Sequence, residues 1–371
     1  PINLNRDKGN YDNASDIVSW WRMGDSDSGA GSILTDQVNP TLGAEIITGF
    51  TNGSTYGLDT LTTSGRDISA GIETSGNWGG CVSNSFAVVA GEIYEVSFDL
   101  TYTSGTDTLR AVITAGADGA GGETGTFYTN TDGVNKGYLV SAITDGTAYL
   151  QLGTWHATDV VNFAATNISL RKLNGNAGTL ENGPTFVVDN PPNYSDYSID
   201  LDGTDDYIDC GTGLGTALGD NYAGSLTASL WFKADVTSGN DGLFNIGGFA
   251  GSQGKFQISL QGNILYFTLN GNAWVREVAF TDTTSWHHVA CVYTTGSEAD
   301  TKMYLDGIAV GTGGASFPAA ADMDFAGLKT IIGAYYSSTY PFDGNIDEVA
   351  VWTSALTSAQ VNDIYNGGVP A

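Results

Sequence analysis

The stretch Ser198–Asp209 reads SIDLDGTDDYID, and three shorter segments follow it in the C-terminal half of the chain. They are SWHHVA at 285–290, MYLDG at 303–307 and FDGNIDEVAVW at 342–352. Around these segments, short runs of alternating apolar residues recur between clusters of Gly, Asn, Asp, Ser and Thr. That pattern is typical of strands separated by turns. The sequence therefore predicts an all-β protein.

Alternation of apolar and polar residues is clearest in three runs. In Tyr94–Leu100 every second residue is apolar or aromatic, which marks one buried strand face. Phe256–Leu260 alternates in the same way, and Ile264–Thr268 is typical of a more fully buried strand. Helical periodicity is confined to one short segment, Ser358–Tyr365.

The four C-terminal segments, taken in this order, resemble the laminin-G-like members of the concanavalin A-like sandwich superfamily. Four motifs in the right order are more specific than any one of them alone. The resemblance implies a β-sandwich that recognises surfaces or glycans, since only some branches of the superfamily are catalytic.

Two N-terminal segments predict that this sandwich is interrupted. IVSWWRMG at 17–24 and ILTDQVN at 33–39 resemble the opening strand and turn of the laminin-G-like family. The phrase that follows in the family reads Asn-x-Gly-Thr-Leu-x-Asn-Gly-Pro, and here it appears only at 174–184. We therefore expect the sandwich to occupy residues 15–42 and 174–371, with a second domain inserted at 43–173.

The inserted segment opens with AEIITGFTNG at 44–53 and closes with FAATNISLRK at 163–172. This order resembles the jelly-roll carbohydrate-binding modules, and the length suits an eight-stranded β jelly roll. Residues 1–14 are polar. They are either a loose terminus or an N-terminal arm that docks onto a neighbouring subunit.

Acidic residues dominate the charge of the chain. Asp and Glu number 41 against 13 Lys and Arg, for a formal net charge of −28. A field of that sign opposes binding to nucleic acid or to an anionic membrane. It fits saline surroundings, where salt screens the self-repulsion, and it supplies carboxylates for Ca²⁺. Three cysteines do not make a disulfide framework, so we expect buried free thiols.

No run of the sequence approaches 18 apolar residues, and the first residues lack the apolar core of a secretory signal. We therefore expect no membrane span, and a protein that reaches a surface by assembly into a particle.

Catalytic groupings are not evident in the sequence. Glycosidases of this superfamily use two carboxylates at alternating strand positions, but the expected same-face neighbours of Asp347 and Glu348 are apolar. His287 and His288 are adjacent, so on a strand they face opposite ways, and we expect His288 to be a hydrogen-bonded core residue. Neither a nucleophile triad nor a phosphate loop nor zinc-type spacing occurs. The sequence predicts that the protein is not an enzyme.

The resemblance also implies a structural Ca²⁺, because sandwiches of both kinds often hold one. Asp25 follows the first expected strand, Asp343 and Asp347 lie in the last one, and such strands are often paired. We expect these three carboxylates to be calcium ligands. The alternative is that they are solvated carboxylates in turns.

Sugar recognition needs aromatic rings that stack on pyranoses and planar polar side chains. Trp20, Trp231 and Trp352 read as packing residues. The remaining candidates are aromatic or imidazole side chains between polar residues, where a role in the core is hard to justify. They are Trp78, Phe127, Tyr128, Tyr138, Trp155, His156, Trp274, Tyr335, Tyr336 and Tyr340.

Together these features favour a non-enzymatic bacteriophage virion surface protein: a capsid decoration, head fibre or tail appendage that displays glycan-binding or host-surface-binding sandwiches. Its expected partners are other virion proteins and host or environmental glycans, with no nucleic acid, and it is expected to be a homo-oligomer. The alternative is a secreted, extracellular bacterial glycan-binding protein. A glycoside hydrolase or lyase is a third reading.

Overall fold

The computed structural model describes residues 16–23, 33–34, 36, 42–52, 58–72, 79–88, 92–105, 108–116, 124–141, 146–154, 161–173, 175–191, 197–247, 254–271, 273–313, 317–319, 322–335 and 340–366. The chain divides into two compact units, each described by itself. Unit 1 comprises residues 1–40 and 175–371, and unit 2 comprises residues 41–174. The sequence placed these junctions at 42/43 and 173/174.

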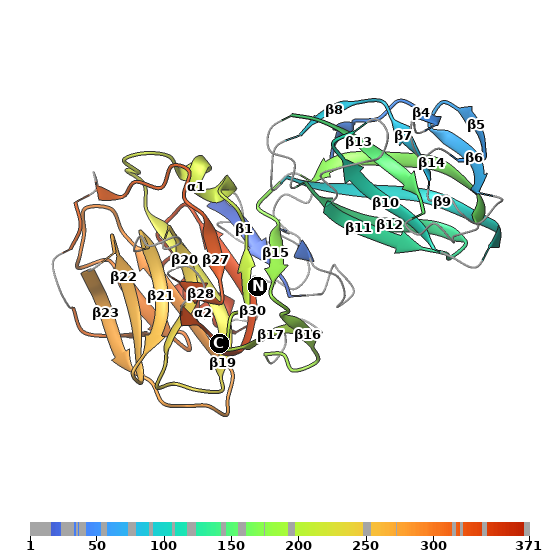
Figure 1. The fold of residues 1–371 in the computed structure, drawn as a ribbon. Coiled ribbons are helices and arrows are strands. Elements are labelled where there is room, and N and C mark those ends of the chain that lie inside the picture. The colour runs from blue at the N-terminus through green and yellow to red at the C-terminus, as the bar shows by residue number, and fades with distance from the viewer. Residues whose placement is uncertain are drawn as a thin grey trace. The chain divides into compact units, whose positions relative to one another are not determined.

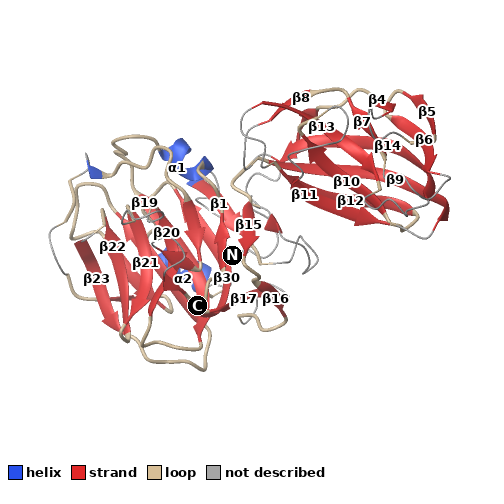
Figure 2. Cartoon of the chain, viewed as in Figure 1, coloured by secondary structure: helices blue, strands red, loops and turns tan. Residues whose placement is uncertain are grey.

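Unit 1 consists of two eight-stranded sheets (Figures 1 and 2). The first sheet has the order β16 (Thr185–Val187), β17 (Ser198–Asp202), β30 (Asp343–Trp352), β19 (Leu226–Ala234), β24 (His287–Tyr293), β25 (Lys302–Leu305) and β26 (Ile308–Val310), and β1 (Ile17–Trp21) also pairs with β30. The second has the order β2 (Ile33–Leu34), β15 (Gly178–Glu181), β18 (Tyr207–Asp209), β27 (Thr330–Ile332), β20 (Asn240–Ile246), β21 (Phe256–Gln261), β22 (Ile264–Leu269) and β23 (Ala273–Ala279). A short hairpin, β28 (Ala334–Tyr335) and β29 (Tyr340–Pro341), and the helices α1 (Gly213–Leu218) and α2 (Ser358–Tyr365) complete the unit.

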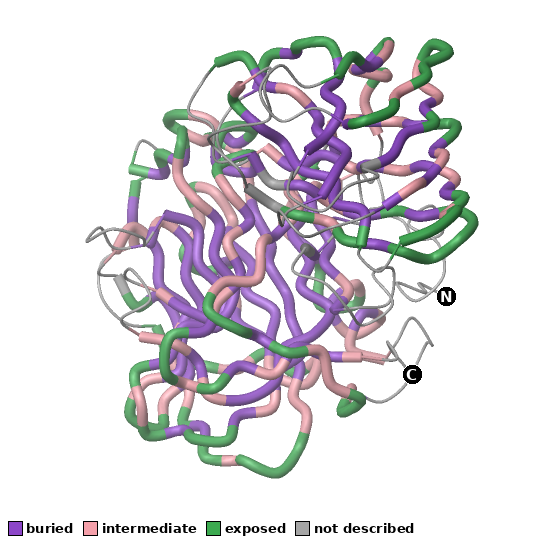
Figure 3. The backbone as a smooth tube through the Cα atoms, turned by 45° about the vertical axis from the view of Figure 1, so that its right-hand side comes forward, coloured by how far each residue is buried: buried purple, intermediate pink, exposed green. Residues whose placement is uncertain are grey.

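The two sheets of unit 1 share one apolar core, so the unit is a β-sandwich, as the sequence predicted. Phe232 and Ile346 from the first sheet and Phe244, Phe256 and Phe267 from the second are fully buried in it. Figure 3 shows buried residues running along the strands, while most exposed residues lie in the connections. The predicted helical segment forms α2, which begins with a capping box between Thr357 and Gln360.

The N-terminal segment completes the first sheet through what we call the β1–β30 seam. β1 pairs with the second half of β30, so the expected pairing of first and last strands is confirmed. Glu348 accepts hydrogen bonds from Trp20 Nε1 at 2.6 Å and from Arg22 Nε at 3.0 Å. Asp347 accepts from the backbone amides of Met23 and Glu348. Both acids are buried and engaged in holding β1.

A bulge in β30 changes the expected alternation of that strand. Glu348 adopts a positive φ of 49°, and the register with β19 shifts beside it. After the bulge, Val349 and Val351 face the core, whereas Asp347 lies opposite the outward-facing Trp231. The expectation that Asp347 shares a face with these valines was therefore wrong.

The two adjacent histidines have opposite surroundings, as expected for neighbours on a strand, but the hydrogen-bonded one is not His288. His287 Nδ1 lies 2.8 Å from Asp306 Oδ2. His288 is fully buried against the rings of Trp231 and Tyr365, which also stack on each other, and neither imidazole nitrogen has a hydrogen-bond partner within the described residues. His288 is buried because Tyr365 of α2 packs on it. Strand alternation alone does not predict a contact with a helix that is distant in the sequence.

Unit 2 consists of two six-stranded sheets around a second core. One has the order β11 (Thr124–Thr129), β10 (Leu109–Thr114), β13 (Gly146–Gly153), β7 (Gly80–Ser83) and β4 (Phe50–Asn52), with β8 (Phe86–Val88) also paired to β13. The other has the order β12 (Gly133–Val140), β9 (Ile93–Gly105), β14 (Val161–Leu173), β6 (Asp67–Ile72) and β5 (Thr60–Ser64), with β3 (Leu42–Glu45) also paired to β14. The alternation predicted for Tyr94–Leu100 is confirmed, since Tyr94, Val96, Phe98 and Leu100 are all buried in this core.

The cysteines are buried free thiols, as expected. Burial raises the pKa of Cys81 to about 12, so this thiol is unreactive at neutral pH. None of the helices in the described part of the chain is long and apolar enough to cross a membrane.

Candidate functional site

In unit 2, the outer face of the sheet that contains β10 and β13 carries polar side chains in rows. Leu109, Ala111 and Ile113 of β10 point into the core, so Arg110 and Val112 between them point outward. Residues directly opposite each other in antiparallel strands share a face. The register therefore aligns one outward row across β11, β10, β13 and β7: Tyr128, Arg110, Gly153 and Gly80.

A second outward row places Gln151 diagonally beside Arg110. Gln151 lies opposite Val112 of β10 and opposite Val82 of β7. Both Arg110 and Gln151 are only 3% exposed. Gln151 Oε1 is buried and accepts no hydrogen bond from any described residue. A buried acceptor without a partner is unusual in a folded protein. Gln151 Oε1 is therefore the most informative atom of this face.

Gly80 lets the Gln151 amide lie flat against β7. A Cβ at Gly80 would stand 2.7 Å from Gln151 Nε2 and 2.8 Å from the Leu152 carbonyl oxygen. Any larger residue there would displace the amide. The ring of Tyr128, which is 49% exposed, lies at the edge of the same face opposite Arg110. A fixed amide, a guanidinium and an exposed phenol ring are side chains that bind sugar hydroxyls and stack on sugar rings.

The other aromatic residues predicted in unit 2 do not join Tyr128 on this face. Phe127 is the strand neighbour of Tyr128 and points the other way, where it packs edge-on against Phe98 and covers Gly137. Tyr138 belongs to the other sheet, beneath the Lys136 ammonium. Trp78, Trp155 and His156 lie outside the described residues. In the sequence they fall next to Gly79 and Thr154, which adjoin β7 and β13.

In unit 1, Trp274 of β23 is 48% exposed, and its ring centroid lies 5.3 Å from that of Tyr266. Tyr335 and Tyr340 stack across the β28–β29 hairpin with centroids 4.8 Å apart. Burial raises the pKa of Tyr335 to about 12, and the charges of Tyr340 and Asp241 add to the effect. Tyr336 lies outside the described residues.

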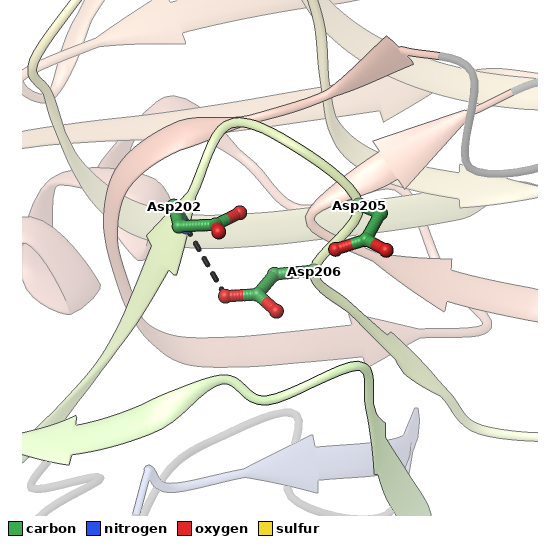
Figure 4. A group of neighbouring side chains, drawn as sticks. All are labelled: Asp202, Asp205 and Asp206. Carbon is green, nitrogen blue, oxygen red and sulfur yellow. Dashed lines mark hydrogen bonds between the residues drawn. The ribbon is translucent and has the colours of Figure 1, made fainter.

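The turn between β17 and β18 gathers three carboxylates (Figure 4). The ligand oxygens of Asp202, Asp205 and Asp206 all lie within 4.8 Å of one another. Asp206 is buried, and its Oδ2 accepts a hydrogen bond from the Asp202 backbone amide at 3.2 Å. Burial chiefly, and then the charges of Asp202 and Asp205, raise the pKa of Asp206. Hard oxygen ligands of this kind suit Ca²⁺, which would neutralise the mutual repulsion.

This acidic turn was not among the predicted metal ligands. Asp205 and Asp206 are consecutive in the chain, so as strand residues they would face apart, but both lie in a turn, where period-two alternation does not apply. Asp343 lies opposite Asp202 in the β17–β30 register and belongs to the same region. Asp347 is engaged in the β1–β30 seam instead, and Asp25 lies outside the described residues.

Comparison with known proteins bears on unit 1. Residues 202–362 match the model of the concanavalin A-like lectin/glucanases superfamily. No curated protein matches the chain.

Among solved structures, the chain is similar to domain 4 of AbnA, a GH43 extracellular arabinanase from Geobacillus stearothermophilus, in complex with arabinotriose. The identity is 21%, the alignment covers 51% of this chain and 87% of that one, and the TM-score is 0.35. It is also similar to the binding domain of botulinum neurotoxin DC in complex with rat synaptotagmin II, with 12% identity, 52% and 47% coverage and a TM-score of 0.39. The chain thus spans about half the length of the neurotoxin domain. At these TM-scores the likeness carries no argument about ligands.

Proposed function

We propose that this chain, whose unit 1 carries a concanavalin A-like domain, is a non-enzymatic glycan-binding protein whose unit 2 binds sugar on the outer face of the β10–β13 sheet. The observation that carries the proposal is the buried, unpartnered Gln151 Oε1 beside Arg110 on a face edged by the exposed Tyr128. A sugar hydroxyl donates a hydrogen bond to such an oxygen.

Binding rather than hydrolysis is favoured by the use that the chain makes of its buried acids. Asp347 and Glu348 hold β1 in place through backbone and side-chain donors, so neither is free to move protons to a substrate. On the described face of unit 2 the aligned rows contain no carboxylate pair.

We further propose that the protein is displayed on the virion surface of a bacteriophage, in contact with other virion proteins, as a capsid decoration, head fibre or tail appendage. The strongly acidic surface charge and the combination of two sandwiches favour this setting. Many copies on one particle turn weak individual contacts into firm attachment. Gold-labelled antibody on purified particles tests this: regular label on heads or tails supports it, and label only on cells or in the medium contradicts it.

The binding proposal is tested by calorimetric titration of oligosaccharides, first selected on a glycan array, into the full chain. Tyr128→Ala removes the exposed ring, and we expect roughly tenfold weaker binding, since loss of about 1.4 kcal/mol corresponds to that factor. Val134→Ala is the matched control, because Val134 is 83% exposed on β12 of the other sheet of unit 2. Equal affinity for the two variants would contradict the proposed site.

A further inference from the structure

Unit 1 contains a pocket at the edge where its two sheets meet. β23 is the last strand of the second sheet, and β26 is the last strand of the first. Glu277 of β23 forms an isolated bridge with Thr312, which follows β26, so the two edge strands are joined at this point. The pocket beside the bridge has a volume of about 570 Å³, which lies in the range of small-molecule sites. Its lining combines charged side chains with small apolar residues.

Arg276 is the most deeply buried charged residue of this pocket. It is 9% exposed and lies opposite the core residue Phe267, because the register between β22 and β23 shifts beside it. Its Nη1 and Nη2 donate hydrogen bonds to the backbone carbonyls of Val275 and Glu298. A guanidinium has five N–H donors, so donors remain for a ligand. Arg276 forms no ion pair with any described carboxylate, and a buried charge without a counterion is costly.

Lys302, the first residue of β25, is the second cation of the pocket. It is half-buried, and its ammonium has no hydrogen bond or ion pair with any described residue. Other ammonium groups of the described chain do pair with carboxylates, at Lys136, Lys172, Lys233 and Lys329. The chain has 41 acidic residues and only 13 basic ones, so a cation without a carboxylate partner is conspicuous. Two such cations line this one pocket.

Two carboxylates near the pocket do not neutralise these cations. Glu298 also lines the pocket, but its side chain is exposed and forms no ion pair with Arg276 or Lys302. Glu277 is the strand neighbour of Arg276, lies opposite Tyr266 and faces the other side of the sheet. The pocket therefore carries a net positive charge. Charges farther away than about 8 Å are largely screened at physiological ionic strength, so the overall charge of −28 does not cancel this local field.

The remaining wall of the pocket is small and apolar. It is formed by Ala299, Ala309, Val310, Gly311 and Gly313. A Cβ at Gly313 would lie 3.6 Å from Arg276 Nη1, so a larger side chain there would occupy the space beside the guanidinium. A guanidinium and an ammonium together suit a carboxylate, and small apolar side chains leave room for a hydrocarbon or aromatic body. The lining therefore fits a ligand that has both parts.

We propose that the pocket between β23 and β26 binds a small organic anion, a carboxylate attached to an apolar body. Arg276 and Lys302 hold the carboxylate, and Ala299, Ala309 and Val310 contact the apolar body. This site is separate from the proposed glycan-binding face of unit 2 and does not depend on it.

The test is calorimetric titration of benzoate into the full chain, with benzamide as the neutral molecule of the same shape and inorganic sulfate as the anion without an apolar body. Benzoate should bind at least tenfold more tightly than either. Lys302→Gln removes one cation and should weaken benzoate binding about tenfold. Lys255→Gln is the matched control, since it removes the same charge from unit 1 where the ammonium bonds to Asn270 and to the Asp322 carbonyl, outside the pocket.

A second variant, Gly313→Leu, fills the pocket. Gly313 does not have a positive φ, so leucine introduces no backbone strain there, and benzoate binding should disappear while thermal melting shows a folded protein. The proposal is overturned if wild type does not bind benzoate, if benzamide or sulfate binds as tightly, or if Lys302→Gln and Lys255→Gln have the same affinity. Tyr128→Ala should leave benzoate binding unchanged, so failure of this site and failure of glycan binding by unit 2 are distinguishable.

Discussion

The β1–β30 seam and the outer face of the β10–β13 sheet both bury polar side chains, but they differ in whether those side chains have hydrogen-bond partners. In the seam, Glu348 and Asp347 accept hydrogen bonds from Trp20, Arg22 and backbone amides. On the face of unit 2, Gln151 Oε1 has no partner within the described residues. A buried polar group without a hydrogen-bond partner lowers the free energy of unfolding by about 1–3 kcal/mol, so it does not stabilise the fold. The comparison teaches that satisfied groups serve stability and unsatisfied ones mark sites for ligands.

This rule is limited by several buried groups that have no partner among the described residues and lie inside the fold, such as Ser229 Oγ, Thr330 Oγ1 and His288. His288 is fully buried and unpartnered, yet the rings of Trp231 and Tyr365 cover it. An unsatisfied group therefore indicates a ligand site only where it lies on a sheet face that also carries an exposed aromatic residue, as the face of Gln151 does with Tyr128. The following predictions separate stability effects from binding effects.

The largest effect is expected in the seam. Glu348→Ala removes the buried carboxylate that accepts hydrogen bonds from Trp20 and Arg22, so the free energy of unfolding should fall by about 3 kcal/mol. Urea denaturation measures this, with exposed Glu298→Ala as the control that changes stability by less than about 0.5 kcal/mol. Glycan affinity of the folded variant should be unchanged. A stability equal to wild type would mean that the seam does not hold β1.

The second effect is a dependence of stability on pH at His288. Burial lowers the pKa of His288 to about 4, below the ordinary value of 6.5. The unfolded chain therefore binds this proton more readily, and stability present above pH 6.5 is lost as the pH falls toward 4, by about 3 kcal/mol at 1.36 kcal/mol per unit. His288→Phe should lose less stability than wild type over that range in denaturation curves. An equal loss of stability in wild type and His288→Phe between pH 6.5 and pH 4 would contradict this prediction.

The neighbouring His287 should show the opposite dependence of stability on pH. Its hydrogen bond with Asp306 raises its pKa, so its contribution is fully present below pH 6.5 and is lost as the pH rises through the folded-state pKa. His287→Gln should therefore reduce stability more at acidic than at alkaline pH, opposite to the behaviour of His288→Phe.

A smaller effect is expected from calcium at the acidic turn. If Asp202, Asp205 and Asp206 hold the ion, free Ca²⁺ at ten times its Kd adds about 1.4 kcal/mol to the stability of unit 1. Melting curves with Ca²⁺ and with a chelator measure this, and Asp206→Asn should abolish the difference. A calcium response that survives in Asp206→Asn would place the ion elsewhere.

The smallest stability effect is expected at Gln151. Gln151→Leu removes an unsatisfied acceptor and replaces it with a side chain of similar size, so the free energy of unfolding should change by less than about 0.5 kcal/mol or rise. Glycan binding should nevertheless fall below detection. A clear loss of stability would show that the amide serves the fold, and the comparison with the seam would then fail.

The sequence predicted the parts of this structure that local pattern controls. Alternation in Tyr94–Leu100 and Phe256–Leu260 identified buried strand faces, and helical periodicity in Ser358–Tyr365 identified α2. Ordered motifs at 198–209 and 342–352 identified the fold of unit 1. These features depend on residues that are near one another in the chain.

The candidate sites depend instead on register between distant strands. Arg110 and Gln151 share a face only because β10 pairs with β13, and the sole local signal was a polar residue within each apolar strand. The bulge at Glu348 and the turn at Asp205 both break the alternation on which the sequence argument relied. Trp274 was predicted as a ligand residue, but its neighbours Thr268 and Tyr266 emerge only from the pairing of β22 with β23.

The central claim is that the face of unit 2 binds glycans, and calorimetry on three proteins tests it most directly. An array-selected oligosaccharide is titrated into the full wild-type chain, Gln151→Leu and Val134→Ala, after melting curves show that all three are folded. The account predicts binding to wild type and Val134→Ala and none to Gln151→Leu. Equal binding to all three proteins would contradict it.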